Sequence, residues 1–411
     1  MKNDTIFPII IIGGGPAGFF AGCLLKQKQP DLDVILLEKS QKLLTKVALS
    51  GNGRCNLTNS CFDPKKLVEN YPRGSKELLG PFHTFGPHET IEWFEAHEVG
   101  LKTEQDGRIF PVSNSAQTII DCLLKEAKGL TILRGVSVEK IEKTKDEPFI
   151  LHLNDGEILQ CQRLLIATGS NPSIMKEIQT LGHTIEPLMP SLFTFNTPNS
   201  PLLDLAGQAV EKVSLKLFNF TQTGPVLLTH WGLSGPAILK LSSWAAKKLF
   251  ESSYKADLHI NWLGNCSLQD AINTISQTKK AHGEKICSSF CPFPLSKSFW
   301  KRFCELASIT ETTRWAYLQH EKALALCKKL TEDTIHIDGK SDNKDEFVTC
   351  GGVKLSEVNF KTMESRLIPN LYFAGEVLDI DGITGGFNLQ NCWTTGFLAA
   401  EGMATPQQKQ T

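Results

Sequence analysis

The sequence has no apolar run long enough to cross a membrane. None of its hydrophobic stretches reaches the roughly 18 residues that a transmembrane helix requires. Neither charge sign is in excess, because 43 Lys and Arg stand against 44 Asp and Glu, for a net charge of −1. This balance counts mildly against a dedicated nucleic-acid binder, although a local basic patch can be hidden in a neutral total.

Closely spaced redox cysteines are also missing. Twelve cysteines are scattered over 411 residues without a single C-x-x-C pair. This pattern is typical of reduced, mostly buried thiols in a cytosolic protein, and it gives no support to a dithiol relay. Cys55 is expected to be inert rather than redox-active, because it has no resolving partner nearby. Cys287 and Cys291 lack His or Cys companions, so packing explains them better than zinc, and no metal site is predicted.

Length and texture predict several domains. A chain of 411 residues is longer than one ordinary domain, and length alone predicts two or three. Near Glu186 the texture changes to short β-like runs separated by Pro- and Gly-rich turns, and over 267–333 helical spacing takes over. In 267–333 ten basic residues stand against seven acidic ones, a balance of +3 that is typical of a solvated helical surface. The N-terminus is interpreted as a first strand rather than a signal peptide, which favours a cytoplasmic protein.

The first part of the chain contains the signature of a dinucleotide-binding βαβ unit. A buried β-branched run leads into Gly13-x-Gly15-x-x-Gly18, a packed helix and a second strand. Gly13 permits a tight turn, Gly15 lets a pyrophosphate approach the backbone, and Gly18 allows close helix–strand packing. Glu38 ends the second strand, where an acid accepts hydrogen bonds from an adenosine ribose and disfavours a 2′-phosphate. The site therefore suits FAD or NAD better than NADP.

Two later segments favour FAD over NAD. Residues 371–391 contain a short strand that ends in Gly375-Glu376, followed by glycines that open a final helix. In FAD proteins a carboxylate here commonly holds a ribityl hydroxyl, and the positive end of the helix dipole can stabilise negative charge on a reduced flavin. Thr168-Gly169, after another buried strand, supplies a third approach of backbone to the cofactor.

Four longer motifs carry a resemblance to a known family: KVALSGNGRCNLTN at 46–59, GRIFPVSNSAQTI at 107–119, HWGLSGPAILKLS at 230–242 and the segment 349–396. They are similar to the BaiN-type flavoproteins, NAD(P)/FAD-dependent oxidoreductases that include aminoacetone oxidase-like proteins. The resemblance implies an α/β fold, with a glutathione-reductase-like Rossmann FAD domain interrupted by a small β-barrel domain, itself interrupted by a helical domain. The predicted boundaries are 1–187 with 346–411 for the FAD-binding domain, 188–266 with 334–345 for the small β domain, and 267–333 for the helical insert.

The resemblance extends the FAD site beyond the glycine loop. It implies contributions from the Arg54 loop, the strand around 136–138 and the 375–390 segment. The predicted cofactor-binding residues are Gly13, Gly15, Pro16, Ala17, Gly18, Glu38, Lys39, Lys46, Arg54, Val138, Ala167, Thr168, Gly169, Gly375, Glu376, Gly386, Asn388 and Leu389. An alternative for Arg54 is a loop-stabilising cation bonded to backbone carbonyls.

His230 is the acid–base candidate outside the cofactor motifs, because an imidazole exchanges its proton near neutral pH. A satisfied histidine in a turn is the alternative. Asp379 and Asp381 lie beside the flavin segment in the sequence. We expect them either to orient loop amides and tune the ring, or to cap a turn.

These features predict an FAD-dependent oxidoreductase in which flavin N5 takes hydride from NADH or NADPH and passes it to an unidentified acceptor. The nicotinamide is expected to dock transiently, because the sequence has no second G-x-G-x-x-G. Three alternatives stay open: an oxidase that uses dioxygen, a reductase of a nucleobase in RNA, and a flavin-binding redox sensor. The expected partner is a small-molecule substrate rather than a membrane, and the oligomeric state is left undetermined.

Overall fold

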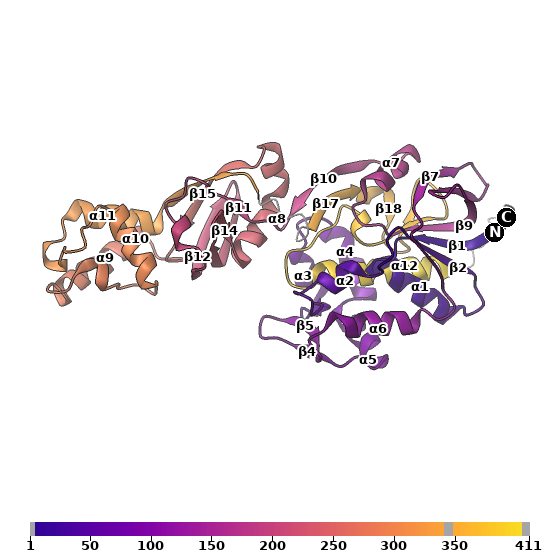
Figure 1. Cartoon of the computed structure of the whole chain (residues 1–411), viewed down its shortest axis with the longest axis horizontal. Helices are drawn as coiled ribbons and strands as arrows, with labels where there is room; N and C mark the ends of the chain where they lie inside the picture. The colour runs from indigo at the N-terminus through magenta and orange to yellow at the C-terminus, as the bar shows by residue number, and fades with distance from the viewer. Residues whose placement is uncertain (1–4, 341–347, 405–411) are drawn as a thin grey trace. The chain divides into compact units, whose positions relative to one another are not determined.

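The computed structural model of the protein describes residues 5–340 and 348–404. The chain divides into two compact units, which are drawn in Figure 1. Unit 1 contains residues 1–189 and 349–411, and unit 2 contains residues 190–348. The second unit is therefore an insertion into the first. The three-part boundaries predicted from the sequence stay a prediction.

Unit 1 is built on a nine-stranded mixed sheet with a parallel centre. The parallel strands, in spatial order, are β20 (Leu371–Phe373), β9 (Ile158–Ile166), β1 (Ile6–Ile12), β2 (Val34–Glu38) and β6 (Thr131–Arg134). Antiparallel strands complete it: β18 (Val358–Asn359), β19 (Glu364–Ser365), β7 (Val138–Lys143) and β8 (Phe149–Leu153). Four consecutive isoleucines of β1 are almost wholly buried, as expected for a central parallel strand.

Helices and two small sheets surround this sheet. The helices are α1 (Pro16–Lys28), α2 (Thr45–Leu49), α3 (Pro64–Leu67), α4 (Ser75–Thr84), α5 (Pro87–Ala96), α6 (Ala116–Glu126), α7 (Pro172–Thr180) and α12 (Phe387–Ala404). The small sheets are β3 (Thr58–Asn59), β5 (Arg108–Pro111) and β4 (Leu101–Thr103), and the pair β10 (Ile185–Ser191) and β17 (Val348–Val353). An aromatic cluster joins three of these helices: the Phe20 ring of α1 lies 4.9 Å from Trp93 of α5 and 5.4 Å from Trp393 of α12, centroid to centroid.

Unit 2 contains a six-stranded antiparallel sheet that nearly closes into a barrel. Its order is β11 (Phe195–Asn196), β14 (Gly232–Ser234), β13 (Phe220–Leu228), β12 (Ala209–Leu217), β15 (Lys255–Asn261) and β16 (Asp333–Asp338). The two edges meet, because Asn196 donates its backbone N–H to Gly339 O at 3.1 Å and its side-chain Nδ2 to Lys340 O at 2.9 Å. Helix α8 (Pro236–Glu251) packs on β13.

A helical segment is inserted between β15 and β16 of this barrel. It consists of α9 (Leu268–Ala281), α10 (Lys297–Leu306) and α11 (His320–Thr331). These helices share one hydrophobic cluster with the sheet, in which Trp262, Trp300 and Trp315 are fully buried. The Trp262 Nε1–H donates to Asp333 at 3.0 Å, so the chain just after β15, where the insert begins, is tied to the start of β16, where it ends.

The predicted α/β fold class is therefore confirmed, but several predicted elements were wrong. Helix α8 lies in a region expected to be β structure. The sequence also predicts one strand over 131–141, but the structure has two, β6 and β7, because Gly135 has a φ of +73° and breaks the run. It predicts another strand over 192–195, of which only Phe195 belongs to a strand, because Leu192 has a φ of +57°. Within the described residues, no helix has the length and apolar character needed to cross a bilayer.

A buried histidine connects the two segments of the chain that form unit 1. The His183 side chain is completely buried, with Nδ1 3.0 Å from Glu357 Oε2 and Nε2 2.9 Å from Ser365 Oγ. Ser365 Oγ also accepts the backbone N–H groups of Leu367 and Ile368. Its own proton is therefore left for His183 Nε2, which must be unprotonated to accept it. Burial lowers the pKa of His183 and outweighs the opposing effect of Glu357, in agreement with a neutral ring.

These hydrogen bonds of His183 predict a pH-dependent contribution to folding stability. Below the ordinary histidine pKa of about 6.5 the unfolded chain takes up a proton that folded His183 does not. Folding stability therefore decreases as the pH is lowered. The stability advantage of the wild type over His183→Gln should therefore shrink, by about 1 kcal/mol, between neutral and mildly acidic pH. Urea unfolding at several pH values measures this. The exposed His88→Gln serves as control, and a wild-type advantage that stays constant with pH would refute the argument.

Candidate functional site

Two adjoining cavities lie at the carboxyl ends of the parallel strands β1, β2 and β9, where open α/β sheets bind ligands. One has a volume of about 340 Å³ and the other about 450 Å³. Both are lined by Gly13, Glu38, Lys39 and Thr168, so these residues stand between them. The strand order of Figure 1 thus brings together segments separated by more than a hundred residues in the sequence.

The three glycines of the first loop have different roles. Gly13 has a φ of +112°, and a Cβ there would lie 2.4 Å from Ala167 O. A Cβ on Gly18 would lie 2.2 Å from Gly13 O. A Cβ on Gly15 meets nothing within 4 Å and would project into the smaller cavity, which Gly15 lines. Gly13 and Gly18 are therefore needed for the fold, whereas Gly15 keeps space open for a ligand.

The Glu38 carboxylate is held in a fixed orientation by backbone donors. Oε2 accepts the N–H of Gly14 at 2.8 Å, and Oε1 accepts the N–H of Ser40 at 2.8 Å. A carboxylate has about four acceptor positions, so each oxygen keeps capacity for another donor. Because Glu38 lines both cavities, it can accept hydrogen bonds from a ligand's hydroxyl groups.

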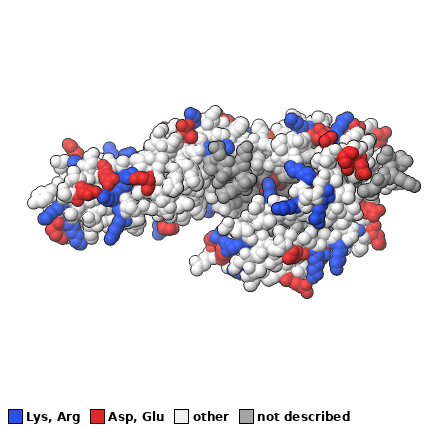
Figure 2. Space-filling model, in the orientation of Figure 1, with Lys and Arg blue, Asp and Glu red and all other residues white. Residues whose placement is uncertain are grey.

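Lysines form a rim around the smaller cavity. Lys39, Lys42 and Lys46 line it and are exposed, and Figure 2 shows Lys and Arg side chains gathered on this face of unit 1. Lys46 forms an ion pair with Glu376. Partial desolvation of the Lys46 ammonium group opposes its charge, but the Glu376 carboxylate outweighs this effect, so the pKa of Lys46 is raised. A positive rim beside the N-terminus of α1 suits an anionic group such as a pyrophosphate.

The structure brings most of the predicted cofactor residues together. Those that line the smaller cavity are Gly13, Gly15, Pro16, Ala17, Glu38, Lys39, Lys46, Ala167, Thr168, Gly169 and Glu376. Val138 lines the larger one. Gly18, Arg54, Gly375, Gly386, Asn388 and Leu389 line neither cavity.

The residues of the last segment shape the backbone beside the cavity. Gly375 has a φ of +75°, and its N–H donates to Thr395 Oγ1 at 2.9 Å. Gly386 has a φ of +92°, and a Cβ there would lie 2.4 Å from Thr58 O. Asn388 bonds both the N–H and the C=O of Gly382 at 2.8 Å. Their direct contact with a cofactor stays a prediction.

Arg54 is engaged within the protein. Its Nη1 lies 2.7 Å from Glu104 Oε1, and its guanidinium carbon lies 4.0 Å from the centre of the Phe110 ring. Glu104 also accepts from Arg108 at 3.1 Å. The bonded partner of Arg54 is therefore a carboxylate rather than the backbone carbonyls of the alternative interpretation. The role of Arg54 as a cofactor ligand stays a prediction.

The other singled-out side chains have ordinary surroundings. His230 is exposed in the turn between β13 and β14 of unit 2, and its catalytic role stays a prediction. Asp381 is fully buried and forms an ion pair with Arg73, and Asp379 Oδ1 accepts the N–H of Gly351 at 3.0 Å. Burial raises the pKa of Asp379.

Cys55 is buried, which raises its pKa to about 12 and keeps the thiol protonated, as expected for an inert cysteine.

Sequence reasoning missed several residues of the cavity wall: Gly14, Ser40, Lys42, Leu44, Thr45, Ala374 and Cys392. A signal existed for Lys42, because Lys39, Lys42 and Lys46 follow one another at spacings of three and four. Leu44 carried no signal, since it lies in an irregular segment with a φ of +54°.

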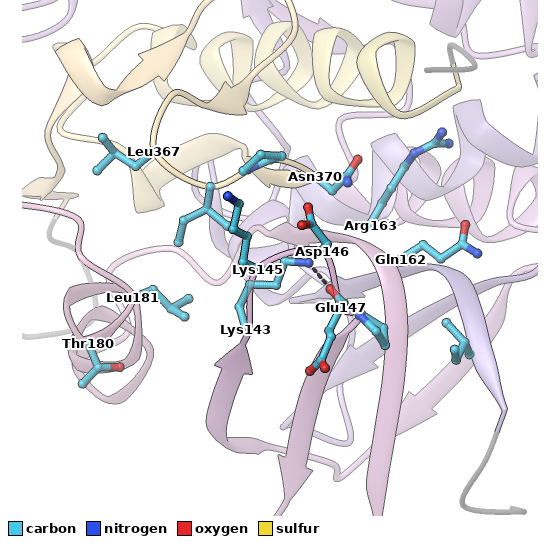
Figure 3. Close-up of a pocket in the computed structure, with 14 residues that line it drawn as sticks. Lys143, Lys145, Asp146, Glu147, Gln162, Arg163, Thr180, Leu181, Leu367 and Asn370 are labelled. Atoms are coloured by element: carbon cyan, nitrogen blue, oxygen red, sulfur yellow. Dashed lines mark hydrogen bonds between the residues drawn. The ribbon is translucent and has the colours of Figure 1, made fainter. Parts of the chain in front are cut away.

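A larger hollow, of about 910 Å³, lies elsewhere in unit 1. Figure 3 shows it with Lys143, Arg163 and Asn370 among its labelled residues. It lies beside the starts of β1 and β20, opposite the ligand-binding edge. Lys143 donates to the carbonyl oxygen of Glu147 and Arg163 to that of Met403, so these cations are engaged with backbone. Size alone therefore does not make it the candidate site.

Comparisons with known proteins match nearly the whole chain. A family model described as the HI0933-like protein Rossmann domain matches residues 7–402. The chain is 31% identical to a protein of Escherichia coli named ribosomal RNA dihydrouridine synthase, with 96% of this chain and 97% of that protein covered. It is also 31% identical to a 3-dehydro-bile acid delta(4,6)-reductase of Clostridium scindens, with 96% and 98% covered.

One solved structure supports the fold. The open conformation of a flavocytochrome c3 fumarate reductase superimposes with a TM-score of 0.50 at 14% identity, covering 98% of this chain and 79% of that one. At this identity the likeness concerns the architecture alone.

The glycine geometry gives a test of the site. Gly15→Val should leave folding intact, because a Cβ at this position meets no protein atom within 4 Å, yet it should abolish FAD binding by filling the cavity. Gly18→Val should instead destabilise the protein by several kcal/mol, through a backbone clash of the overpacking type. FAD titration of the apo-proteins and thermal unfolding measure the two effects. Arg54→Ala is the control and should bind FAD more tightly than Gly15→Val; equal FAD affinity of Gly15→Val and wild type would contradict the site.

Proposed function

Because the chain belongs to the HI0933-like protein family and is an FAD-dependent oxidoreductase, we propose that it reduces a carbon–carbon double bond conjugated to a carbonyl group, in uridine of ribosomal RNA. NADH or NADPH is the proposed hydride donor. The observation that carries the cofactor assignment is the space kept open at Gly15, beside the oriented Glu38 carboxylate.

The residues around the two cavities fit an FAD molecule. Gly15 and the N-terminus of α1 would receive the pyrophosphate, with Lys46 supplying a counter-charge from the rim. Glu38 would accept the ribose hydroxyls of the adenosine half, and Glu376 a ribityl hydroxyl, after exchange of its ion pair with Lys46. Bound FAD would supply hydride transfer through its N5 atom.

The two named reactions of the relatives share one kind of chemistry. In uridine the C5=C6 bond is conjugated to the C4 carbonyl, and in a 3-dehydro-bile acid the 4,6 double bonds are conjugated to the 3-keto group. Hydride adds to the far carbon of such a system, and a proton then adds next to the carbonyl. Two relatives at 31% identity that both carry out this addition support a reductase rather than an oxidase.

Ribosomal RNA is favoured over a bile acid by the charge of unit 2. Residues 190–348 carry 18 Lys and Arg against 15 Asp and Glu, a net charge of +3. A positively charged unit attracts a polyanion more strongly than a bile acid, which carries a single carboxylate on an uncharged ring system. A small conjugated enone is the second candidate, because the bile acid reductase matches over 96% of the chain.

The reaction can be tested in two half-reactions. We expect the purified protein to carry FAD that acid precipitation releases, and NADH or NADPH to bleach its absorbance under anaerobic conditions. Unmodified rRNA transcripts should then reoxidise the flavin and acquire dihydrouridine, measured by nucleoside mass spectrometry. Transcripts are needed because cellular rRNA can already carry the product.

Gly15→Val is the matched control, since it should fold yet form no dihydrouridine. Reoxidation by a 3-keto-4,6-diene bile acid without any dihydrouridine would select the second candidate. Reoxidation by dioxygen alone, with hydrogen peroxide as the product, would contradict the reductase.

A further inference from the structure

The two units carry opposite net charges, which the total conceals. Residues 190–348 have a net charge of +3, whereas residues 1–189 and 349–411 together have 25 Lys and Arg against 29 Asp and Glu, a net of −4. On the face drawn in Figure 2, basic and acidic side chains alternate over α9, α10 and α11. The local arrangement within unit 2 therefore decides where a polyanion would be attracted.

Two segments of the helical insert are held side by side. Ile286 and Arg314 form an antiparallel bridge, and backbone hydrogen bonds of 2.9 Å join Cys287 to Thr313 and Trp315 to Lys285. A further bond of 2.9 Å runs from the Ala316 N–H to Gly283 O. The end of α9 is thereby fixed beside the 3-10 turn Trp315–Tyr317.

Basic side chains gather where these segments meet. We call this surface the tip patch and define it by six residues, Lys279, Lys280, His282, Lys285, Arg314 and Tyr317. Five of them are exposed and His282 is half-buried. Glu284 is the acidic residue within 279–285, and the four Lys and Arg side chains of the patch outnumber it.

Three of the six other Lys and Arg side chains of the insert are neutralised by carboxylates. Lys301 pairs with Glu311, Arg302 with Asp204 and Lys329 with Asp333. Within the described part of the chain, the four cations of the tip patch have no carboxylate within ion-pair distance. Lys279 donates to Leu318 O at 2.8 Å, which leaves its charge uncompensated. Their field is therefore available to a partner.

The tip patch also contains an exposed aromatic ring. Tyr317 is 78% exposed, although the neighbouring Trp315 is fully buried. The other ring at this place, Phe290, is covered by protein: Lys285 Nζ lies 4.1 Å from its centre and the His282 ring 4.5 Å away. No side chain of the described residues covers the Tyr317 ring in this way. Proteins bind unpaired nucleotides with two elements, cations that contact the phosphates and an exposed aromatic ring that stacks on a base.

We propose that the tip patch is an RNA-docking surface that binds single-stranded rRNA, with Lys280, Lys285 and Arg314 on phosphates and a base stacked on Tyr317. The proposal rests on the proposed function for the identity of the RNA. It revises the interpretation of 267–333 as a solvated surface alone. An acidic membrane would use the cations but would not require a flat ring facing solvent, so RNA accounts for both features.

The test compares two triple variants of the full-length protein. Lys280→Ala, Lys285→Ala and Arg314→Ala are combined in one variant. The control combines Lys212→Ala, Lys216→Ala and Lys247→Ala, three exposed lysines of the same unit outside the patch. Affinity for unmodified rRNA transcripts is measured over a series of salt concentrations. The patch variant should lower the slope of log affinity against log salt by about two, because single strands lose about 0.7 per phosphate contact.

Tyr317 is tested separately from the charges. Tyr317→Ala should weaken rRNA binding about five-fold or more without changing the salt slope, whereas Tyr317→Phe should bind as the wild type does, because it retains the stacking face. All variants should keep the wild-type FAD content and the wild-type rate of flavin reduction by nicotinamide, which confirms that they are folded.

The outcomes separate the surface from the reaction. Equal affinity and salt slope for the patch variant and its control would overturn the docking surface, even if the wild type forms dihydrouridine. Loss of binding to phosphatidylserine vesicles, with rRNA binding unchanged, would also overturn it and assign the patch to an acidic membrane. Patch-dependent rRNA binding without any dihydrouridine would support the surface and refute the proposed reaction instead.

Discussion

The structure depends on the close contact between the start of α1 and the ends of two central strands. Gly13 lies against Ala167 at the end of β9, and Gly18 lies against Gly13, so that any Cβ at either glycine would overlap a backbone oxygen. On its other side α1 is approached by α12, where a Cβ on Gly396 would lie 2.7 Å from Ala17 O. The loop that precedes α1 is thus fixed from several directions by packing alone. Its shape requires no ligand.

This contact also organises the chemistry of the site. The loop that is fixed by packing offers its Gly14 N–H to Glu38, which orients the carboxylate toward both cavities. The place for an anionic pyrophosphate and the acceptor for a ribose are therefore parts of one rigid arrangement. Preorganisation of this kind lowers the conformational cost of binding, since the groups are in position beforehand. Gly15 adds nothing to packing, so the absence of its side chain is explained by the ligand.

The sequence predicted this part of the molecule well, because each element there has a local signal. Buried β-branched strands, spaced glycines and an acid at a strand end identify the βαβ unit, and the family resemblance is confirmed by the family match over 7–402. Helix α8 was missed because the Pro- and Gly-rich positions after Glu186 were interpreted as turns between β-like runs, whereas a proline at the first position, here Pro236, commonly begins a helix. The pairing of Arg54 with Glu104 joins residues 50 positions apart and leaves no local pattern. Such contacts are determined by the tertiary fold.

Charge shows the same difference between totals and arrangement. A net charge of −1 suggests a protein indifferent to polyanions, yet it is the sum of two units with charges of +3 and −4. Electrostatic attraction is screened beyond about 8–10 Å at physiological salt, so an RNA strand senses the charges nearest to it rather than the total. Within unit 2 the same reasoning applies again, since three of the six Lys and Arg side chains of α10 and α11 are neutralised by ion pairs whereas those of the tip patch are not. The net charge of a segment, counted from the sequence, therefore says less about its binding partner than the fraction of its charges that the fold leaves without an ion-pair partner.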